Sequence, residues 1–304
     1  MNNNKLISVI VCCYNPDFEK LKKTLLSIEN QDYPYFEVII SDDGSMVDYF
    51  DELKQWVEKK GWRNIKYNFL PSNVGTVKNI LNACKIAQGE FVKTISPGDF
   101  LFDKYSLSYY MDAFLNKKAD FVYGKFVYFD LNGNVIRNTS PRFKSTFNPK
   151  KLKHNLVIYE DMILGAVVAL RRKLEIEYLS SLDNSVRLLE DAPLEILSVI
   201  NKKNIVCINK PLVWYEYGSG VSTNPNSQNR IEKEFDSLYQ HLYSNYGDNK
   251  LIRKAFKFRQ LSGRKLKKIF CFPGYVFIKF KEFFVKPFFY KQIRNIDEVL
   301  FLKG

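Results

Sequence analysis

Short apolar segments alternate with amphipathic stretches over the first 130 residues of the chain. Segments 6–13, 36–40, 65–70 and 90–95 have the length and apolar content of strands, and the stretches between them carry apolar residues at helical spacing. The more continuous apolar runs are typical of strands that are covered on both faces of a parallel sheet. The pattern predicts an α/β fold with a mostly parallel sheet and helices on both faces.

After residue 120, strands and helices no longer alternate one for one. Segments 121–129 and 135–137 flank Asn132-Gly133, a pair that is typical of a hairpin turn. Farther along we expect a buried strand, a helix, a strand pair and an amphipathic helix, at 163–170, 188–200, 205–217 and 231–246.

Composition restricts the classes of protein that fit. The 304 residues are 46% hydrophobic and 26% charged, a profile typical of globular proteins. No run of 18 apolar residues occurs, and the N-terminus lacks the apolar core of a secretory signal. Five scattered cysteines, two histidines and the absence of CxxC argue against a disulfide framework or a structural zinc site. We therefore expect a reducing compartment, the cytoplasm.

Most of the net charge of +13 lies near the C-terminus. From Arg253 to Arg294 the chain has thirteen Lys and Arg, one acidic residue and twelve Phe and Tyr, so the rest is close to neutral. Such a combination of basic and aromatic residues is compatible with a membrane surface or with single-stranded nucleic acid.

Four loops that follow predicted strands hold the candidate chemistry. They are Cys13-Tyr14-Asn15-Pro16, Ser41-Asp42-Asp43-Gly44-Ser45, residues 73–79 and Ser96-Pro97-Gly98-Asp99. In parallel sheets, ligands bind beyond the carboxyl ends of the strands, where these loops are expected. Each loop alone is also typical of an ordinary strand-to-helix turn, because Asn, Asp, Gly and Ser cap helices. Asn15-Pro16, for example, predicts an N-cap followed by a first-turn proline.

Together and in this order, the four loops resemble the nucleotide-binding half of glycosyltransferase family 2, whose members are inverting enzymes of the GT-A fold. Residues 5–103 carry the resemblance, and a weaker match extends to about residue 224. The resemblance implies a nucleoside-diphosphate-sugar donor, which we expect to be UDP-linked. It also implies Mn²⁺ or Mg²⁺ as cofactor and a hexosyltransferase type of activity.

The resemblance also implies which residues bind the donor. Asp43 is expected to contact the base and Asp42 to hold its own loop, while Lys78 matches a basic position near the diphosphate or is simply solvated. The full expected set is Tyr14, Asn15, Pro16, Asp43, Asn73, Gly75, Lys78, Pro97, Gly98 and Asp99.

The fourth loop departs from the family pattern. Members usually have two adjacent acids, but here Gly98 occupies the first position and Asp99 alone is expected to bind the metal. One protein carboxylate can be enough for a hard cation that keeps waters and shares the donor phosphates. Gly98→Asp is therefore expected to be tolerated or to tighten metal binding. Many members also have a His after the last strand, where this chain has residues 218–222 without one.

The general base of the family is an Asp in a Glu-Asp pair at the start of a late helix. Glu190-Asp191 fits this pattern, so the resemblance implies that Asp191 is the catalytic base. An acidic pair at a helix N-terminus is also common because it opposes the helix dipole. A competing pair, Glu160-Asp161, matches the family less well.

We expect a GT-A catalytic domain over 1–225, with a nucleotide-binding half (1–103) and an acceptor half (104–225), and a helical extension over 226–304. The expected activity is metal-dependent inverting transfer to a hydroxyl of a growing bacterial surface glycan, on a lipid carrier. The alternative is a catalytically degenerate nucleotide-sugar-binding partner subunit, which Gly98 and the missing His favour. Nucleic acid is not an expected partner, because the sheet carries acidic loops. The sequence leaves the oligomeric state open.

The basic, aromatic tail over about 253–294 is expected to lie on the inner face of the cell membrane. A predicted helix at 275–286 places Phe277, Phe280 and Phe284 on one face, with lysines opposite. Anionic lipid would account for both the aromatic residues and the charge. The alternative is a helix that packs its phenylalanines on the catalytic domain.

Overall fold

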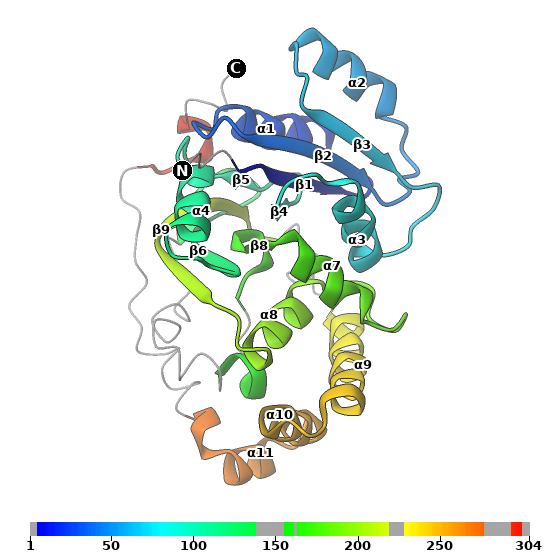
Figure 1. Ribbon diagram of the computed structural model, residues 1–304, viewed down its shortest axis with the longest axis vertical. Coiled ribbons are helices and arrows are strands. Elements are labelled where there is room, and N and C mark those ends of the chain that lie inside the picture. The colour runs from blue at the N-terminus through cyan, green and yellow to red at the C-terminus, as the bar shows by residue number, and fades with distance from the viewer. Residues whose placement is uncertain (1–4, 138–154, 161–162, 219–227, 277–292, 300–304) are drawn as a thin grey trace.

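In the computed structural model, one mixed sheet covered by helices forms the body of the protein (Figure 1). The structure describes residues 5–137, 155–160, 163–218, 228–276 and 293–299. Within these residues the strand order is β3-β2-β1-β4-β8-β6-β9-β5, and β7 pairs with β6. The α/β fold expected from the sequence is confirmed.

The four parallel strands expected from the sequence form the first half of the sheet. They are β1 (Ile7–Cys13), β2 (Phe36–Asp42), β3 (Ile65–Phe69) and β4 (Phe91–Ile95). The helices between them are α1 (Phe18–Glu29), α2 (Phe50–Lys59) and α3 (Thr76–Ile86). Because these strands run in one direction, the loops after β1, β2 and β4 meet at one edge of the sheet.

Helix α1 begins later than the sequence predicts. Its N-cap is Asp17, whose carboxylate accepts the Lys20 N–H at 3.0 Å, so the predicted Asn15 cap is wrong. Asn15 has a φ of 45°, a left-handed conformation that Asn tolerates better than most residues. The Asn15 side chain therefore belongs to the loop and not to the helix.

The second half of the sheet is mixed. Its strands are β5 (Phe100–Leu101), β6 (Phe121–Phe129), β7 (Val135–Arg137), β8 (Ala169–Arg171) and β9 (Ile205–Glu216). β8 runs antiparallel to β4, and β6 runs parallel to β9. β6 and β7 form the predicted hairpin, whereas β9 is one long strand where the sequence predicts a strand pair.

The strand predicted over 163–170 is wrong for most of its length. Gly165–Val167 form a 3-10 turn, η1, and only Ala169 to Arg171 belong to β8. The N–H groups of Val167 and Val168 bond to carbonyls within the same segment, so they are not shared with a neighbouring strand. The apolar run reflects a partly buried turn that leads into a short strand.

The remaining helices pack around this sheet and beyond one end of it. They are α4 (Ser106–Leu115), α7 (Arg172–Ser180), α8 (Asp191–Ile200), α9 (Gln228–Tyr246), α10 (Lys250–Gln260), α11 (Lys265–Cys271) and the short η3 (Ile296–Glu298). Figure 1 shows α10 and α11 at the end of the molecule opposite α2. Arg259, which is 5% exposed, pairs with Glu160, Glu232 and Asp236 and so ties α10 to α9.

A large apolar core joins the sheet to its helices, and a smaller cluster closes the edge at β5 and β9. The smaller cluster includes Phe100, Trp214, Ile296 and Val299. Residues near the C-terminus therefore return to the sheet, where the Ile296 N–H bonds to the Gly133 carbonyl at 2.7 Å.

Candidate functional site

The loop after β2 is tied to the start of α3 by Asp43. This carboxylate, 4% exposed, accepts the N–H groups of Val74 at 2.7 Å and Gly75 at 2.9 Å. Burial raises the pKa of Asp43, and these two backbone bonds oppose that rise. Its neighbour Asp42 accepts the Ser45 N–H and the Tyr49 hydroxyl, so it holds its own loop.

The loop after β1 is fastened to the same place by Asn15. The Asn15 N–H bonds to Ser45 Oγ at 2.6 Å, and Asn15 Oδ1 accepts the Met46 N–H at 2.8 Å. Tyr14 next to it is 49% exposed, which leaves its ring available to a ligand such as a base. Pro16, partly exposed, completes the loop.

The third loop contacts a residue that the sequence reasoning missed, Arg187. Its guanidinium lies 3.3 Å from Asn73 Oδ1, and its carbonyl accepts the Val77 N–H at 3.0 Å. Gly75 has a φ of +94°, and a Cβ there would lie 2.9 Å from the Arg187 carbonyl oxygen. Only glycine allows this close approach. Lys78 lies exposed on the first turn of α3.

The fourth loop holds Asp99 next to the end of β9. Asp99 is 7% exposed, and its Oδ1 accepts the Glu216 N–H at 3.1 Å. The pKa of Asp99 is raised to about 7, mainly by burial, which the Glu216 N–H and the charge of Lys93 oppose. The Thr24 hydroxyl also bridges this loop to α1, since it accepts the Gly98 N–H and donates to the Asp99 carbonyl.

A partly buried ion pair lies beside Gly98. Glu216 is 4% exposed, and its carboxylate pairs with Lys20 of α1 at 2.7 Å. A Cβ on Gly98 would lie 3.2 Å from Glu216 Oε2, and the φ of Gly98 is +98°. The expectation that Gly98→Asp is tolerated is therefore contradicted, because any side chain there is strained and meets this pair.

The oxygen donors at Asp99 fit a hard divalent cation such as Mn²⁺ or Mg²⁺. The Glu216 N–H orients the Asp99 carboxylate, and the nearby Glu216 carboxylate adds a second acidic group from another strand. Among the residues that the structure describes, no group of three His, Cys, Asp or Glu is placed to hold a metal ion.

Asp191 begins α8 and rests against the η1 turn. Its Oδ1 accepts the Ala192 N–H at 2.7 Å, and a Cβ on Gly165 would lie 3.0 Å from Asp191 Oδ2. Burial raises the pKa of Asp191. Hydrogen bonds from backbone N–H groups, including that of Gly165, oppose this rise. The pKa of Glu190 is raised as well, first by burial and then by the charge of Asp191.

The competing pair has a different environment. The Glu160 carboxylate pairs with Arg259 at 3.1 Å, and Asp161 lies outside the described residues. Glu160 therefore takes part in fastening α10.

Asp43 and Glu190 both act electrostatically on Cys12, at the carboxyl end of β1. The pKa of the Cys12 thiol there is raised first by burial and then by charges that include those of Glu190, Glu175 and Asp43. Two buried residues that the sequence pattern did not single out also act on Cys12: Lys93 of β4, which interacts with Asp99 as well, and Glu175 of α7. Burial lowers the pKa of Lys93 to about 7 and raises that of Glu175 to about 8.

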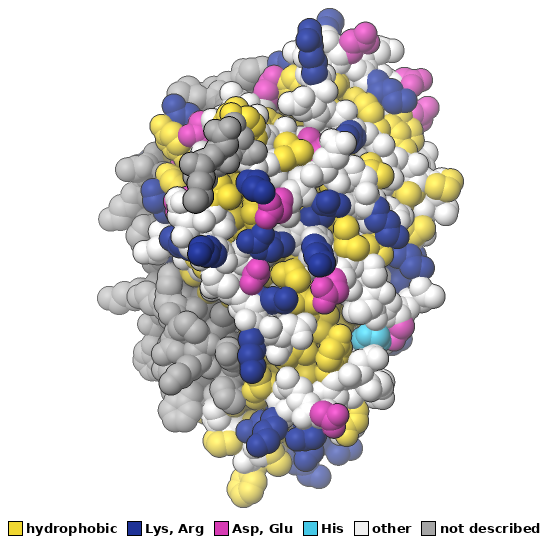
Figure 2. All heavy atoms as spheres, in the orientation of Figure 1, with side chains coloured by type: hydrophobic (Ala, Val, Ile, Leu, Met, Phe, Trp, Pro, Cys, Tyr) yellow, Lys and Arg dark blue, Asp and Glu magenta, His cyan; other side chains and the backbone are white. Residues whose placement is uncertain are grey.

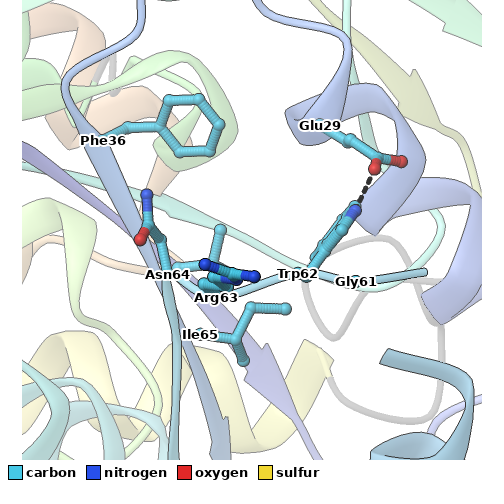
Figure 3. Close-up of a pocket in the computed structure, with 8 residues that line it drawn as sticks. Glu29, Phe36, Gly61, Trp62, Arg63, Asn64 and Ile65 are labelled. Carbon is cyan, nitrogen blue, oxygen red and sulfur yellow. Dashed lines mark hydrogen bonds between the residues drawn. The ribbon is translucent and has the colours of Figure 1, made fainter. Parts of the chain in front are cut away.

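A pocket of about 390 Å³ lies elsewhere, beside the amino ends of β2 and β3 (Figure 3). Trp62 donates a hydrogen bond to Glu29 across it, and Phe36 and Arg63 also line it. Since Asp43 and Asp99 follow the carboxyl ends of their strands, this pocket is separate from the candidate site.

Comparisons with known sequences point to one family. The family model described as Glycosyl transferase family 2 matches residues 8–179, more than half of the chain. An uncharacterized glycosyltransferase of Haemophilus influenzae is 28% identical over 135 residues, which are 44% of this chain and 52% of that relative. The match thus spans about half the length of that relative. An uncharacterized glycosyltransferase of Methanocaldococcus jannaschii is 23% identical over 245 residues, 79% of this chain and 77% of the relative.

Solved structures share the fold. The crystal structure of S. aureus TarS 1-349 in complex with UDP-GlcNAc superimposes on this chain with a TM-score of 0.60 at 21% identity. The match covers 84% of this chain and 72% of the TarS chain. The mannosyltransferase PcManGT from Pyrobaculum calidifontis, in complex with GDP-Man and Mn²⁺, has a TM-score of 0.56 at 17% identity, covering 84% and 68%. At these identities the likeness establishes a common GT-A-like architecture.

Proposed function

Because the chain belongs to glycosyltransferase family 2, we propose that it transfers a sugar from a nucleoside-diphosphate sugar to a hydroxyl group. The observation that carries this proposal is that Asp43 follows β2, Asp99 follows β4, and both Asp43 and Glu190 act electrostatically on Cys12 at the carboxyl end of β1. A UDP-linked donor is the first choice, because TarS binds UDP-GlcNAc. GDP-Man, the ligand of PcManGT, is the main competitor.

In this mechanism the first three loops bind the nucleotide. Asp43 accepts an N–H of the base, and the exposed ring of Tyr14 packs on the base or ribose. Arg187 and Lys78 lie near the N-terminus of α3, where their positive charge would attract the diphosphate. Asn15, Pro16, Asn73, Gly75 and Pro97 shape the backbone around it.

Asp191 is the general base of the proposed transfer. It takes the proton of the acceptor hydroxyl as that oxygen attacks the anomeric carbon, and the bond from this carbon to the diphosphate oxygen breaks. Attack on the face opposite the leaving group inverts the configuration. Contacts with backbone N–H groups fix the direction of the Asp191 carboxylate.

Asp99 would hold the divalent cation, Mn²⁺ or Mg²⁺. When bound, such an ion supplies Lewis-acid stabilisation of the negative charge on the leaving diphosphate. The hydrogen bond from the Glu216 N–H orients the Asp99 carboxylate. The positive charge of Lys20 offsets the negative charge of the Glu216 carboxylate next to it.

A partner subunit that binds a nucleotide sugar without transferring it is the second candidate. The observation in its favour is the Lys20–Glu216 pair, which fills the place beside Gly98 where family members have an acid. Hydrolysis or transfer that requires both a metal and Asp191 would contradict this candidate. Binding of a donor without turnover would support it.

A thermal-shift panel of UDP-, GDP-, dTDP- and CMP-sugars, with and without Mn²⁺, tests the donor proposal. A bound donor stabilises the folded state in proportion to the logarithm of its concentration over Kd. We expect one nucleotide class to raise the unfolding temperature, and Mn²⁺ to increase the effect. Binding of no member of the panel would contradict the proposed function.

We further propose that the acceptor is a growing surface glycan on a lipid carrier and that the protein lies on the inner face of the cell membrane. The support lies on α11, where Leu266, Ile269 and Phe270 are 84%, 43% and 90% exposed. Their spacing of three and four residues places them on one face. Exposed apolar groups of this kind mark interaction surfaces.

Basic side chains are also exposed on α11, at its N-cap and on the preceding helix. These are Arg264 and Lys267, with Lys250, Arg253, Lys254 and Lys257 on α10. Figure 2 shows Lys and Arg side chains gathered at the lower end of the molecule, next to protruding hydrophobic atoms. An exposed apolar face on a helix that also carries exposed basic residues fits anionic lipid. No helix among the described residues has the length and apolar character needed to cross a bilayer, and residues 277–292 of the expected tail lie outside the description.

A further inference from the structure

We propose that Lys93 is a positioning residue of the transfer reaction, because it holds the turn against which the Asp191 carboxylate rests. The turn is η1, and the contact is a hydrogen bond from Lys93 Nζ to the Ala166 carbonyl at 2.7 Å. The proposal rests on the proposed function, in which Asp191 is the base.

Three consecutive residues of η1 are each held by one side chain from a different element. The Asp191 carboxylate of α8 contacts Gly165, and Lys93 of β4 donates to the Ala166 carbonyl. The Tyr110 hydroxyl of α4 donates to the Val167 carbonyl at 3.0 Å. A single turn thus joins the candidate base to the central strand of the sheet.

The Lys93 side chain is fully buried, which is unusual for an ammonium group. Its Nζ donates to the carbonyls of Thr94 and Ala166. The charged and titratable groups around it are Asp99, Glu175 of α7 and Cys12 of β1, and the Tyr110 ring of α4 lies 6.0 Å away. Burying a cation is costly unless such partners compensate, so a purely structural role would be served as well by an apolar residue.

Lys93 therefore lies close to both the candidate cation ligand and the turn that supports the candidate base. Its ammonium lies within electrostatic reach of Asp99, the candidate cation ligand, and its hydrogen bond supports the turn under Asp191. If the turn shifts, the base moves relative to the acceptor hydroxyl, and a displacement of about 1 Å can lower a rate up to about 10²-fold. Donor binding through Asp43 and the first loops, measured without Mn²⁺, is expected to be independent of this turn.

Tyr110→Phe is the matched control for Lys93→Met. Each substitution removes one hydrogen bond from a fully buried side chain to a carbonyl of the same turn, and Lys93→Met also removes the hydrogen bond to the Thr94 carbonyl and the charge. Both are made in the full chain. The readouts are the unfolding temperature, the dissociation constant of the donor that the panel selects, and kcat and KM for release of its nucleoside diphosphate.

We expect Lys93→Met to lower kcat by about 10- to 100-fold while the donor Kd and KM stay within about threefold. Tyr110→Phe should lower kcat by no more than about threefold, because the hydrogen bond from Lys93 to the Ala166 carbonyl still holds the turn. An unchanged kcat in folded Lys93→Met, or equal losses of kcat in both variants, would overturn the proposal. A parallel loss of donor binding and kcat would also overturn it, because that result indicates general damage to the fold.

Lys93→Gln carries the same test if Lys93→Met does not fold. Its amide carries no charge and its side chain is one bond shorter, so we expect kcat to fall by about 3- to 10-fold while the donor Kd stays within about threefold. An unchanged kcat in the Gln variant would then overturn the proposal. Failure of the proposed function is distinguishable, because in that case the native chain itself turns over no donor.

Discussion

The Glu216 carboxylate lies beside Gly98, with its Oε2 3.2 Å from the point that a Cβ on Gly98 would occupy. The two residues are far apart in sequence, yet β9 ends where the loop after β4 turns. An acidic group therefore stands next to Asp99 although residue 98 has no side chain. Lys20 holds this acid in place through its ion pair.

Gly98→Ala is expected to destabilise the protein by about 1–3 kcal/mol, because an L residue is strained at a φ of +98° and meets Glu216. Gly61→Ala is the control, since Gly61 has a φ of +72° and nothing lies within 4 Å of the point that a Cβ there would occupy. The difference between the two unfolding free energies, measured with urea, reports the contact with Glu216. Equal losses would show that this contact is unimportant.

Asp99→Asn should abolish the dependence of donor binding on Mn²⁺, because an amide is a much weaker ligand for a hard cation than a carboxylate. Calorimetry with the selected donor, with and without Mn²⁺, measures the effect. Asp112→Asn on the exposed face of α4 is the control and should behave as the native protein does. Full metal-dependent binding by Asp99→Asn would remove Asp99 from the metal site.

Asp191→Asn should keep donor binding and lower the transfer rate by about 10²–10⁴-fold, as is typical when a general base is lost. Because the protein environment raises the pKa of Asp191, the native rate should rise with pH over a range above the ordinary titration of an aspartate. Rates measured from pH 4 to 8 test both points. The same loss of rate in Asp161→Asn alone would assign the base to the competing pair.

Glu175 should make the stability depend on pH. Its pKa rises from 4.5 to about 8 on folding, so its contribution is fully present below pH 4.5 and is lost as the pH rises through 8. We expect the native unfolding free energy to fall between pH 5 and 7 with a slope of up to about 1.4 kcal/mol per pH unit from this group.

Glu175→Gln should reduce this slope, whereas Glu177→Gln, on the exposed side of the same helix, should not. Urea titrations between pH 5 and 7 avoid the opposite contribution of Lys93, whose pKa falls from 10.5 to about 7 and which therefore adds stability as the pH rises from 7 to 10.5. A slope that Glu175→Gln leaves unchanged would show that Glu175 is ionised in the folded protein.

Replacing Leu266 and Phe270 of α11 with Ser should weaken binding to vesicles that contain anionic lipid, because both side chains are almost fully exposed on a helix that also carries exposed basic residues. Leu131→Ser, at an exposed turn of the β6–β7 hairpin, is the control. Co-sedimentation at low and high salt separates the apolar contribution to vesicle binding from the electrostatic contribution, because salt screens only the latter. Equal binding to neutral and anionic vesicles, or no binding at low salt, would contradict the membrane proposal.

Local sequence patterns predicted the elements of the first half of the fold well. Strands β1 to β4 and the hairpin at Asn132-Gly133 follow the expected segments within a few residues, because period and turn chemistry are encoded by neighbours in sequence. The predicted strand over 163–170 failed, since an apolar run specifies burial but not whether the buried backbone is extended or turned.

The order of strands and loops along the chain was enough to predict that acidic and glycine-rich loops follow parallel strands, and therefore that Asp43 and Asp99 approach one edge of a sheet. The neighbours of these loops could be found only in the folded protein: Arg187 at Asn73, Glu216 at Gly98, and Lys93 at the turn that contacts Asp191. These contacts depend on the insertion of β8, β6 and β9 beside β4 and on the register of each strand. The physical reason is that linear spacing encodes short-range geometry, whereas contacts between distant residues are chosen by how the whole core packs.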